Sequence, residues 1–229
     1  MSQYKLVTYQ SPQGARAGLL VDETIFDVAA ATERASYATM LDVLRDWDAA
    51  RGRLRDAAAT AAGKREARPL AGTKLLPPVP TPGGIFCAGA NFTDHMMEMA
   101  RVQNLDPEPD PHSVGLKPWH FIKTVHCLAA PDSTVKLPPY SKMVDWEAEL
   151  VAVIGRPARN VSIEHALDHV AGYTLANDLS ARDFTKRPHI ADTSPFKYDW
   201  LSQKCFEDAC PLGPWIVPAS AVPDPQNVA

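Results

Sequence analysis

The sequence lacks long hydrophobic runs and has no strong excess of charge of one sign. Among its 229 residues no apolar stretch approaches the length of a membrane span, and Met1 to Lys5 lead into no signal-peptide core. The net charge is −4 with acids and bases interspersed, so no basic face is expected for nucleic acid or a membrane surface. The sequence therefore predicts a cytoplasmic protein with no nucleic-acid and no membrane partner.

Cysteine is scarce and follows no known pattern. The four cysteines, Cys87, Cys127, Cys205 and Cys210, form no C-x-x-C pair and no zinc-like spacing. Without a secretion signal, they are predicted to be free thiols in a reducing compartment. A disulfide between Cys205 and Cys210 is the alternative.

The first part of the chain is predicted to be a small α+β domain, residues 1–76. Thr39 to about Lys64 has the apolar spacing of helices, and Gly52 is expected to separate two of them. A proline-rich segment, 75–84, follows and is expected to be a linker at the domain boundary. Before the helices, turns at Gly14 and at Asp22-Glu23 are expected to join three short strands: 4–9, 17–21 and 24–28.

The second part, residues 77–229, is predicted to be a larger domain that carries the candidate functional residues. It combines many short strands with few helices, which indicates a β-rich α+β fold. One helix is expected to start near Thr93. A second helix is expected over 162–170, with Ser162 as its N-cap. Strands are expected at 85–88, 120–123, 144–154, 172–177 and 210–217.

Two glutamates, Glu147 and Glu149, lie two residues apart in the apolar strand that Gly155 closes. Alternation would place both on one face together with Asp145. Like charges on one face repel one another, and burial raises the cost further. A divalent cation with hard oxygen ligands removes that cost. The alternative is a solvated outer face of an edge strand, which the unbroken apolar run after Glu149 disfavours.

Other residues have the chemistry of a site but are ambiguous by themselves. His95 and Glu98 lie three residues apart and would share a helix face. This spacing suits a histidine base that is held by a carboxylate. The alternative is an ordinary His–Glu pair on the surface. Asp178 follows a strand and is either functional or the cap of the next turn. Lys123 and Lys204 stand among apolar residues, where each either binds a carboxylate or extends its amine to water.

Taken together, four motifs resemble the fumarylacetoacetate hydrolase family. They are Cys87 to His95, Asp145 to Leu150, Gly172 to Asp183, and Lys204 with the segment Cys210 to Trp215. The resemblance covers nearly everything after the proline-rich segment and is specific, because the motifs agree in order and spacing. It implies a mixed β-roll, usually a homodimer, preceded by a small variable N-terminal domain.

The resemblance also implies a site. The family's divalent metal is held by two glutamates and an aspartate that match Glu147, Glu149 and Asp178, with Mg²⁺, Mn²⁺ or Ca²⁺ as the ion. The family's His–Glu dyad matches His95 and Glu98.

The positions of Lys204 and Arg182 match residues that serve the substrate or the electrostatics around the metal. The implied reaction is cleavage of a C–C bond in a 2,4-dioxo acid, with His95 activating water. The alternatives are a decarboxylase, isomerase or hydratase acting on a 2-oxo dicarboxylate, and a non-catalytic metal-binding homologue.

Three features depart from the family pattern. Phe92 replaces the usual tyrosine, and Thr185 stands where several hydrolases have a glutamine that contacts the substrate. Both leave the substrate open. The chain is also expected to lack the end of the family's domain, because relatives continue for several dozen residues beyond the position of Ala229.

Overall fold

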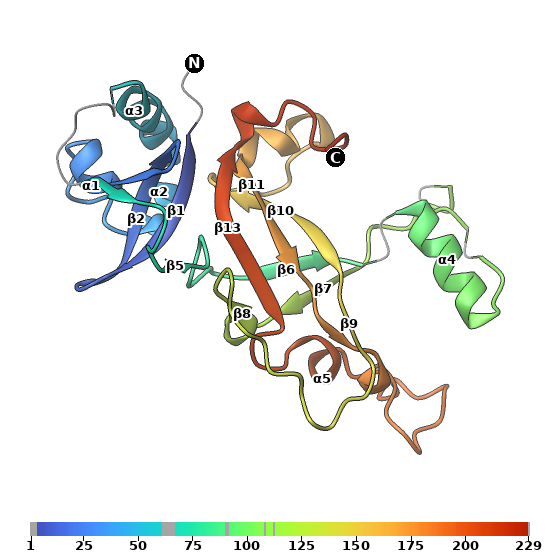
Figure 1. Ribbon diagram of the computed structural model, residues 1–229. Helices are drawn as coiled ribbons and strands as arrows, with labels where there is room; N and C mark the ends of the chain where they lie inside the picture. The colour runs from blue at the N-terminus through green and yellow to red at the C-terminus, as the bar shows by residue number, and fades with distance from the viewer. Residues whose placement is uncertain (1–3, 61–66, 90–91, 108, 112, 229) are drawn as a thin grey trace.

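The computed structural model of the chain describes residues 4–60, 67–89, 92–107, 109–111 and 113–228. A long, mostly antiparallel sheet runs through it in the strand order β10-β11-β13-β1-β2-β3-β4. Figure 1 shows the first strands and their helices on one side of the molecule and the later strands on the other. The sheet consists of β10 (Ala148–Ile154), β11 (Val170–Asn177), β13 (Cys210–Pro218), β1 (Lys5–Ser11), β2 (Gly14–Val21), β3 (Thr24–Asp27) and β4 (Ala67–Pro69), with β5 (Leu75–Leu76) on β1 and β8 (Leu128–Ala129) on β13.

The strands β1 and β13 join the two parts of the chain, with Leu6 opposite Ile216. Both side chains are fully buried in the largest core cluster, which also includes Val153 and Ala171 from β10 and β11. The proline-rich segment was expected to be a linker, but its first two residues, Leu75–Leu76, form a strand that pairs with β1. The division into domains 1–76 and 77–229 stays a prediction.

The three N-terminal strands form the expected meander. Strands β1 and β2 pair from Lys5↔Leu20 to Ser11↔Gly14, and β2 pairs with β3 from Gly18 to Val21. Gly14 has φ +104° and Asp22 has φ +50°, and both values belong to the region that tight turns require. The predicted strands and turns are confirmed here.

Short helices cover this meander: α1 (Val28–Ala31), α2 (Met40–Arg45) and α3 (Trp47–Ala59). The prediction that Gly52 separates two helices is wrong, because Gly52 lies inside α3 and the break falls at Asp46. The Asp46 carboxylate accepts a 2.6 Å hydrogen bond from the Tyr37 hydroxyl. Asp46 therefore has a side-chain partner outside both helices, which favours a chain break there, whereas a single glycine only weakens a helix.

The remaining elements surround the later strands, and residues 90 and 91, between β6 and α4, are among those not described. In Figure 1, α4 stands away from the rest of the chain. The elements are β6 (Ile85–Ala88), α4 (Thr93–Gln103), β7 (His120–Lys123), η1 (Val125–Cys127), β9 (Val144–Asp145), η2 (Ile163–His169), β12 (Ser180–Ala181), η3 (Arg182–Phe184), α5 (Trp200–Lys204) and η4 (Ala219–Ala221). Strand β6 pairs with β7, and β9 pairs with β12.

The α+β class is confirmed, and so are most of the predicted elements of the second part. Two details differ. The strand predicted over 144–154 is interrupted at Trp146 and Glu147. The helix predicted over 162–170 is a 3₁₀ helix whose Ser162 makes no side-chain cap bond to a backbone N–H.

Candidate active site

The site forms where two pairs of strands end side by side. The backbone N–H of Asp178, just after β11, donates a 2.8 Å hydrogen bond to the carbonyl of Glu147. In return the N–H of Glu147 donates to the side-chain oxygen of Asn177 at 3.1 Å. These bonds span the break between β9 and β10. Glu147 therefore lies opposite Asp178, in the same register that pairs Ala148 with Asn177 and Asp145 with Ser180 on the two sides of the break.

The ammonium group of Lys204, at the end of α5, bridges the two carboxylates. Its Nζ donates to Glu147 Oε2 at 2.5 Å and to Asp178 Oδ2 at 2.7 Å. Lys204 is 3% exposed and Asp178 is 4% exposed. At this depth, a charge is tolerated only when it is paired and hydrogen-bonded.

A second lysine completes the buried cluster. Lys123, the last residue of β7, donates to Asp178 Oδ1 at 2.7 Å and also to the backbone carbonyls of Leu179 and Lys204. The two oxygens of Asp178 therefore each have a lysine donor. Asp178 is not merely the cap of the following turn, which was the simpler interpretation of its position.

Arg182 extends the cluster towards solvent. Its guanidinium donates to Asp145 Oδ2 at 2.8 Å and to Glu147 Oε1 at 2.5 Å. The neighbouring Asp183 carboxylate does not contact Arg182 but accepts hydrogen bonds from the Ser141 hydroxyl and the backbone N–H of Lys142. The Arg182 guanidinium thus contacts both Asp145 and Glu147.

The charges in the cluster shift two carboxyl groups in opposite directions. Burial alone would raise the pKa of Glu147, but the hydrogen bond and charge of Lys204, with Arg182, lower it to about 2. Burial raises the pKa of Glu149, and the negative charges of Glu147 and Asp178 raise it further, against Lys204 and His95. Glu149 is therefore the carboxylate with the least compensation, and an additional cation near it would be favourable.

The predicted dyad lies on α4. His95 is close enough for its charge to affect Glu149, whereas no hydrogen bond or ion pair joins His95 to Glu98 among the residues that the structure describes. The structure therefore relates His95 to the acidic cluster but does not pair it with Glu98.

An aromatic group flanks the lysines. The Lys204 Nζ lies 5.0 Å from the centroid of the Phe121 ring, and Phe121, Trp119 and Trp200 contact one another at centroid separations from 4.6 to 6.1 Å. The electron-rich ring faces provide a further contact for a cation. Cys87 is the cross-strand partner of Phe121. Burial and the Asp178 charge raise the pKa of Cys87 to about 12, so this thiol is neutral and is not a nucleophile at neutral pH.

The predicted metal ligands fit a divalent cation by chemistry but are not arranged around one. In the described part of the chain, no group of three or more His, Cys, Asp or Glu side chains is placed to hold a metal ion. Glu147 and Asp178 converge instead on the Lys204 ammonium, whose positive charge stabilises the two carboxylates as a metal ion would. Their oxygens, with the uncompensated Glu149, are the hard donors that Mg²⁺ and Mn²⁺ prefer.

Sequence reasoning undervalued one residue of this cluster. The sequence allows Lys123 either to bind a carboxylate or to extend its amine to water, and the structure buries it against Asp178. The available signal was its setting: a lysine at the end of an apolar strand, followed by no charged neighbour. Its partners lie 55 and 81 positions away along the chain, which a local pattern does not reveal.

Comparison with known proteins agrees with these features. The model of the C-terminal domain of fumarylacetoacetate (FAA) hydrolase matches residues 84–229. The chain is 38% identical over 154 residues to the mitochondrial oxaloacetate tautomerase fahd2 of Xenopus laevis, a match that covers 67% of this chain and 43% of that protein. The chain therefore spans less than half the length of this curated relative.

Solved structures are similar over almost the whole chain. Maleylpyruvate hydrolase from Sphingobium sp. SYK-6, in complex with manganese(II) and pyruvate, has a TM-score of 0.66 at 28% identity, covering 96% of this chain and 69% of that one. The 2-hydroxyhepta-2,4-diene-1,7-dioate isomerase of Mycobacterium marinum has a TM-score of 0.62 at 25% identity, covering 94% and 66%. The chain belongs to the fumarylacetoacetate hydrolase family, a family of enzymes with small-molecule substrates.

Proposed function

We propose that this chain acts on a 2-oxo acid by stabilising its enolate, and that the reaction is keto–enol tautomerisation of a 2-oxo dicarboxylate such as oxaloacetate. The observation that carries the proposal is the pair of buried ammonium groups, Lys123 and Lys204, at one carboxylate. The name and 38% identity of the Xenopus laevis tautomerase support this choice of reaction.

The side chains have distinct tasks in this proposal. Arg182, the most exposed cation of the cluster, binds a substrate carboxylate. Lys204 faces the oxygen on C2 and stabilises the negative charge that develops there, which is worth most in a water-poor site. Lys123 holds the Asp178 carboxylate in position.

The proton transfer needs only one base. His95 takes a proton from C3 of the keto form, and the imidazolium so formed returns a proton to the oxygen on C2 to give the enol, so that no atom is gained or lost. The carboxylate of Glu98 orients the imidazole when α4 is positioned over the substrate. A proton moved in this way requires no attacking water.

A divalent metal is proposed as the cofactor, held by Glu147, Glu149 and Asp178. Mg²⁺ is the ion we expect, with Mn²⁺ and Ca²⁺ as alternatives. When bound, the ion would act as a Lewis acid that polarises the 2-oxo and carboxylate oxygens of the substrate. Lys204 would then leave the two carboxylates and turn its ammonium group to the substrate.

The original expectation of C–C bond hydrolysis in a 2,4-dioxo acid remains the second candidate. The maleylpyruvate hydrolase with bound pyruvate favours it, because the same enolate stabilisation serves the carbanion that leaves in such a cleavage. The difference is that His95 would activate water instead of removing a C3 proton. A cytoplasmic location and a homodimer also stay predictions.

The experiment that tests the proposal follows the ultraviolet absorbance of the oxaloacetate enol after rapid dilution of one tautomer. The protein should accelerate the approach to equilibrium with Mg²⁺ or Mn²⁺, and a chelator should remove the acceleration. In parallel, mass spectrometry of acylpyruvate incubations tests the second candidate. Pyruvate plus a second acid, without faster enol formation, would overturn the tautomerase proposal in favour of the hydrolase.

A further inference from the structure

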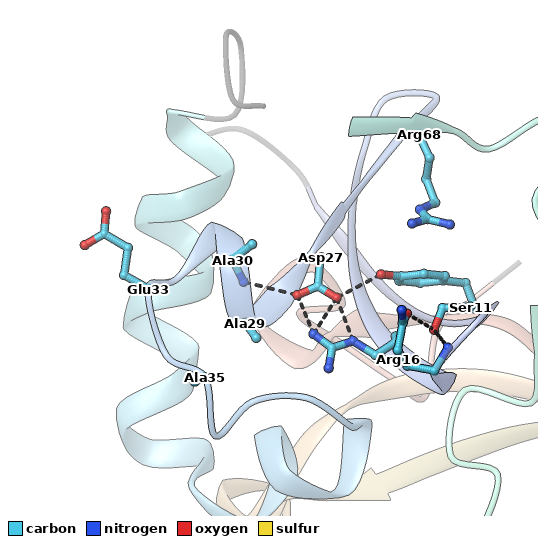
Figure 2. Close-up of a pocket in the computed structure, with 10 residues that line it drawn as sticks. Ser11, Arg16, Asp27, Ala29, Ala30, Glu33, Ala35 and Arg68 are labelled. Atoms are coloured by element: carbon cyan, nitrogen blue, oxygen red, sulfur yellow. Dashed lines mark hydrogen bonds and ion pairs between the residues drawn. The ribbon is translucent and has the colours of Figure 1, made fainter. Parts of the chain in front are cut away.

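A pocket of about 690 Å³ lies far from the lysine cluster, on the N-terminal meander. Figure 2 shows Arg16 and Asp27 in its centre, Arg68 above them and Glu33 at the side. Ala29, Ala30 and Ala35 supply apolar surface to its wall. The size is typical of sites for small organic molecules.

Each carboxylate oxygen of Asp27 already accepts two hydrogen bonds from neighbouring residues. Its Oδ2 accepts hydrogen bonds from the Tyr9 hydroxyl at 2.8 Å and from Arg16 Nε at 2.9 Å. Its Oδ1 accepts from Arg16 Nη2 at 2.9 Å and from the backbone N–H of Ala30 at 3.1 Å. The Arg16–Asp27 pair is therefore neutral as a unit and leaves no oxygen of Asp27 for another cation.

Arg68 has no such partner. Its guanidinium lies over the Tyr9 ring, 4.3 Å from the centroid. Its Nε is buried and makes no hydrogen bond within the described chain. Among the described residues, the Arg68 guanidinium forms no ion pair. A donor without an acceptor costs free energy. Arg68 also lines the pocket, so its guanidinium is a cation at the pocket without an anionic partner in the described chain.

We propose that this pocket is a second binding site, for a small monocarboxylate with an apolar body. The planar fork of Arg68 matches a carboxylate. The alanine wall suits the apolar body of the ligand. Glu33, exposed at the edge of the pocket, disfavours a second carboxylate on the same ligand. This specificity distinguishes the pocket from the lysine cluster, whose proposed substrate is a dicarboxylate.

The test uses a reporter inside the pocket. The protein contains six tyrosines, so labelling with 3-fluorotyrosine gives few ¹⁹F resonances, and Tyr9→Phe assigns the one of interest. Benzoate, a monocarboxylate with an apolar body, should move the Tyr9 resonance in a saturable manner. Succinate should move it at higher concentration only.

Arg68→Gln should weaken benzoate binding by about tenfold or more, since a charge-assisted hydrogen bond contributes about 1.5–3 kcal/mol. Arg53→Gln, on the exposed side of α3, is the matched control and should change nothing. Glu33→Gln leaves Arg68 intact and should improve succinate binding more than benzoate binding, which provides a test even when Arg68→Gln fails to fold.

The outcomes divide cleanly. Two results support the site. The benzoate-induced shift of the Tyr9 ¹⁹F resonance should require Arg68, and the difference in affinity between benzoate and succinate should be smaller in Glu33→Gln than in the wild type. The absence of a saturable Tyr9 shift, or the same shift in Arg68→Gln as in the wild type, overturns it. Activity towards a 2-oxo acid plays no part in either result, so the proposed reaction can fail independently.

Discussion

Lys123 donates a 2.7 Å hydrogen bond to the Asp178 carboxylate, and both side chains are at least nine-tenths buried. Lys123 ends β7 and Asp178 follows β11, and the two residues lie 55 positions apart. Their contact fixes the end of β7 against the turn that follows β11. It also leaves the second oxygen of Asp178 for Lys204, so the ion pair organises the rest of the charged cluster.

Lys123→Met should destabilise the protein by about 3–5 kcal/mol, because removal of one partner leaves a buried charge less compensated. The methionine keeps a similar length, so the loss reports on the charge more than on packing. Urea unfolding measures it, with the exposed Lys136→Met as control. Combined with Asp178→Asn, the two changes should be non-additive by more than about 1 kcal/mol. Simple additivity would show that the two residues are not coupled.

Two glycines should respond to alanine in opposite directions. A Cβ at Gly18 in β2 would lie 2.7 Å from side-chain carbons of both Val7 and Ile25, so Gly18→Ala should cost about 1–3 kcal/mol through overpacking. At Gly52, inside α3, a Cβ meets nothing within 4 Å. Gly52→Ala should therefore stabilise by about 0.5–1 kcal/mol through helix propensity. Thermal unfolding of both variants checks the pair, and a stabilising Gly18→Ala would contradict the packing described for β2.

Alkaline pH should destabilise the protein through Tyr4, which packs on the main core cluster. Burial raises the pKa of Tyr4 from 10.0 to about 12, against the charge of Arg55. The folded state therefore favours the neutral phenol. This contribution to stability is complete below pH 10 and is lost as the pH rises from 10 towards 12.

Unfolding free energies measured across this interval should fall less steeply for Tyr4→Phe than for the wild type. The exposed Tyr140 provides the control, and Tyr140→Phe should leave the slope unchanged. Equal slopes for Tyr4→Phe and the wild type would mean that the phenol of Tyr4 is not held neutral by the fold.

Local patterns in the sequence were sufficient for much of the fold. Alternation and turn residues located β1, β2 and β3, since each of these strands pairs with its neighbour in the sequence. The helix break was misplaced because its position depends on the hydrogen bond from Tyr37 to Asp46, which spacing does not encode. The low helix propensity of glycine indicated a break at Gly52 instead.

The sequence indicates some residues of the candidate site but not the contacts of others. Family motifs pointed to Glu147, Asp178, Arg182 and Lys204, and the structure brings these four together. Lys123 was undervalued because its role depends on contacts made only after folding. The pairing of His95 with Glu98 and the metal triad with Glu149 remain predictions, since both depend on how α4 and the cluster respond to a bound ion and substrate.

The most direct test of the central claim is the rate of oxaloacetate tautomerisation by Lys204→Met, measured beside the wild type and Lys136→Met in the presence of Mg²⁺. Unfolding curves for each variant establish that the compared samples are folded. If the Lys204 ammonium stabilises the enolate, kcat/KM should fall by about 100-fold or more in Lys204→Met, while Lys136→Met keeps the wild-type value. A folded Lys204→Met protein with the wild-type rate would contradict the assignment of the lysine cluster as the catalytic centre.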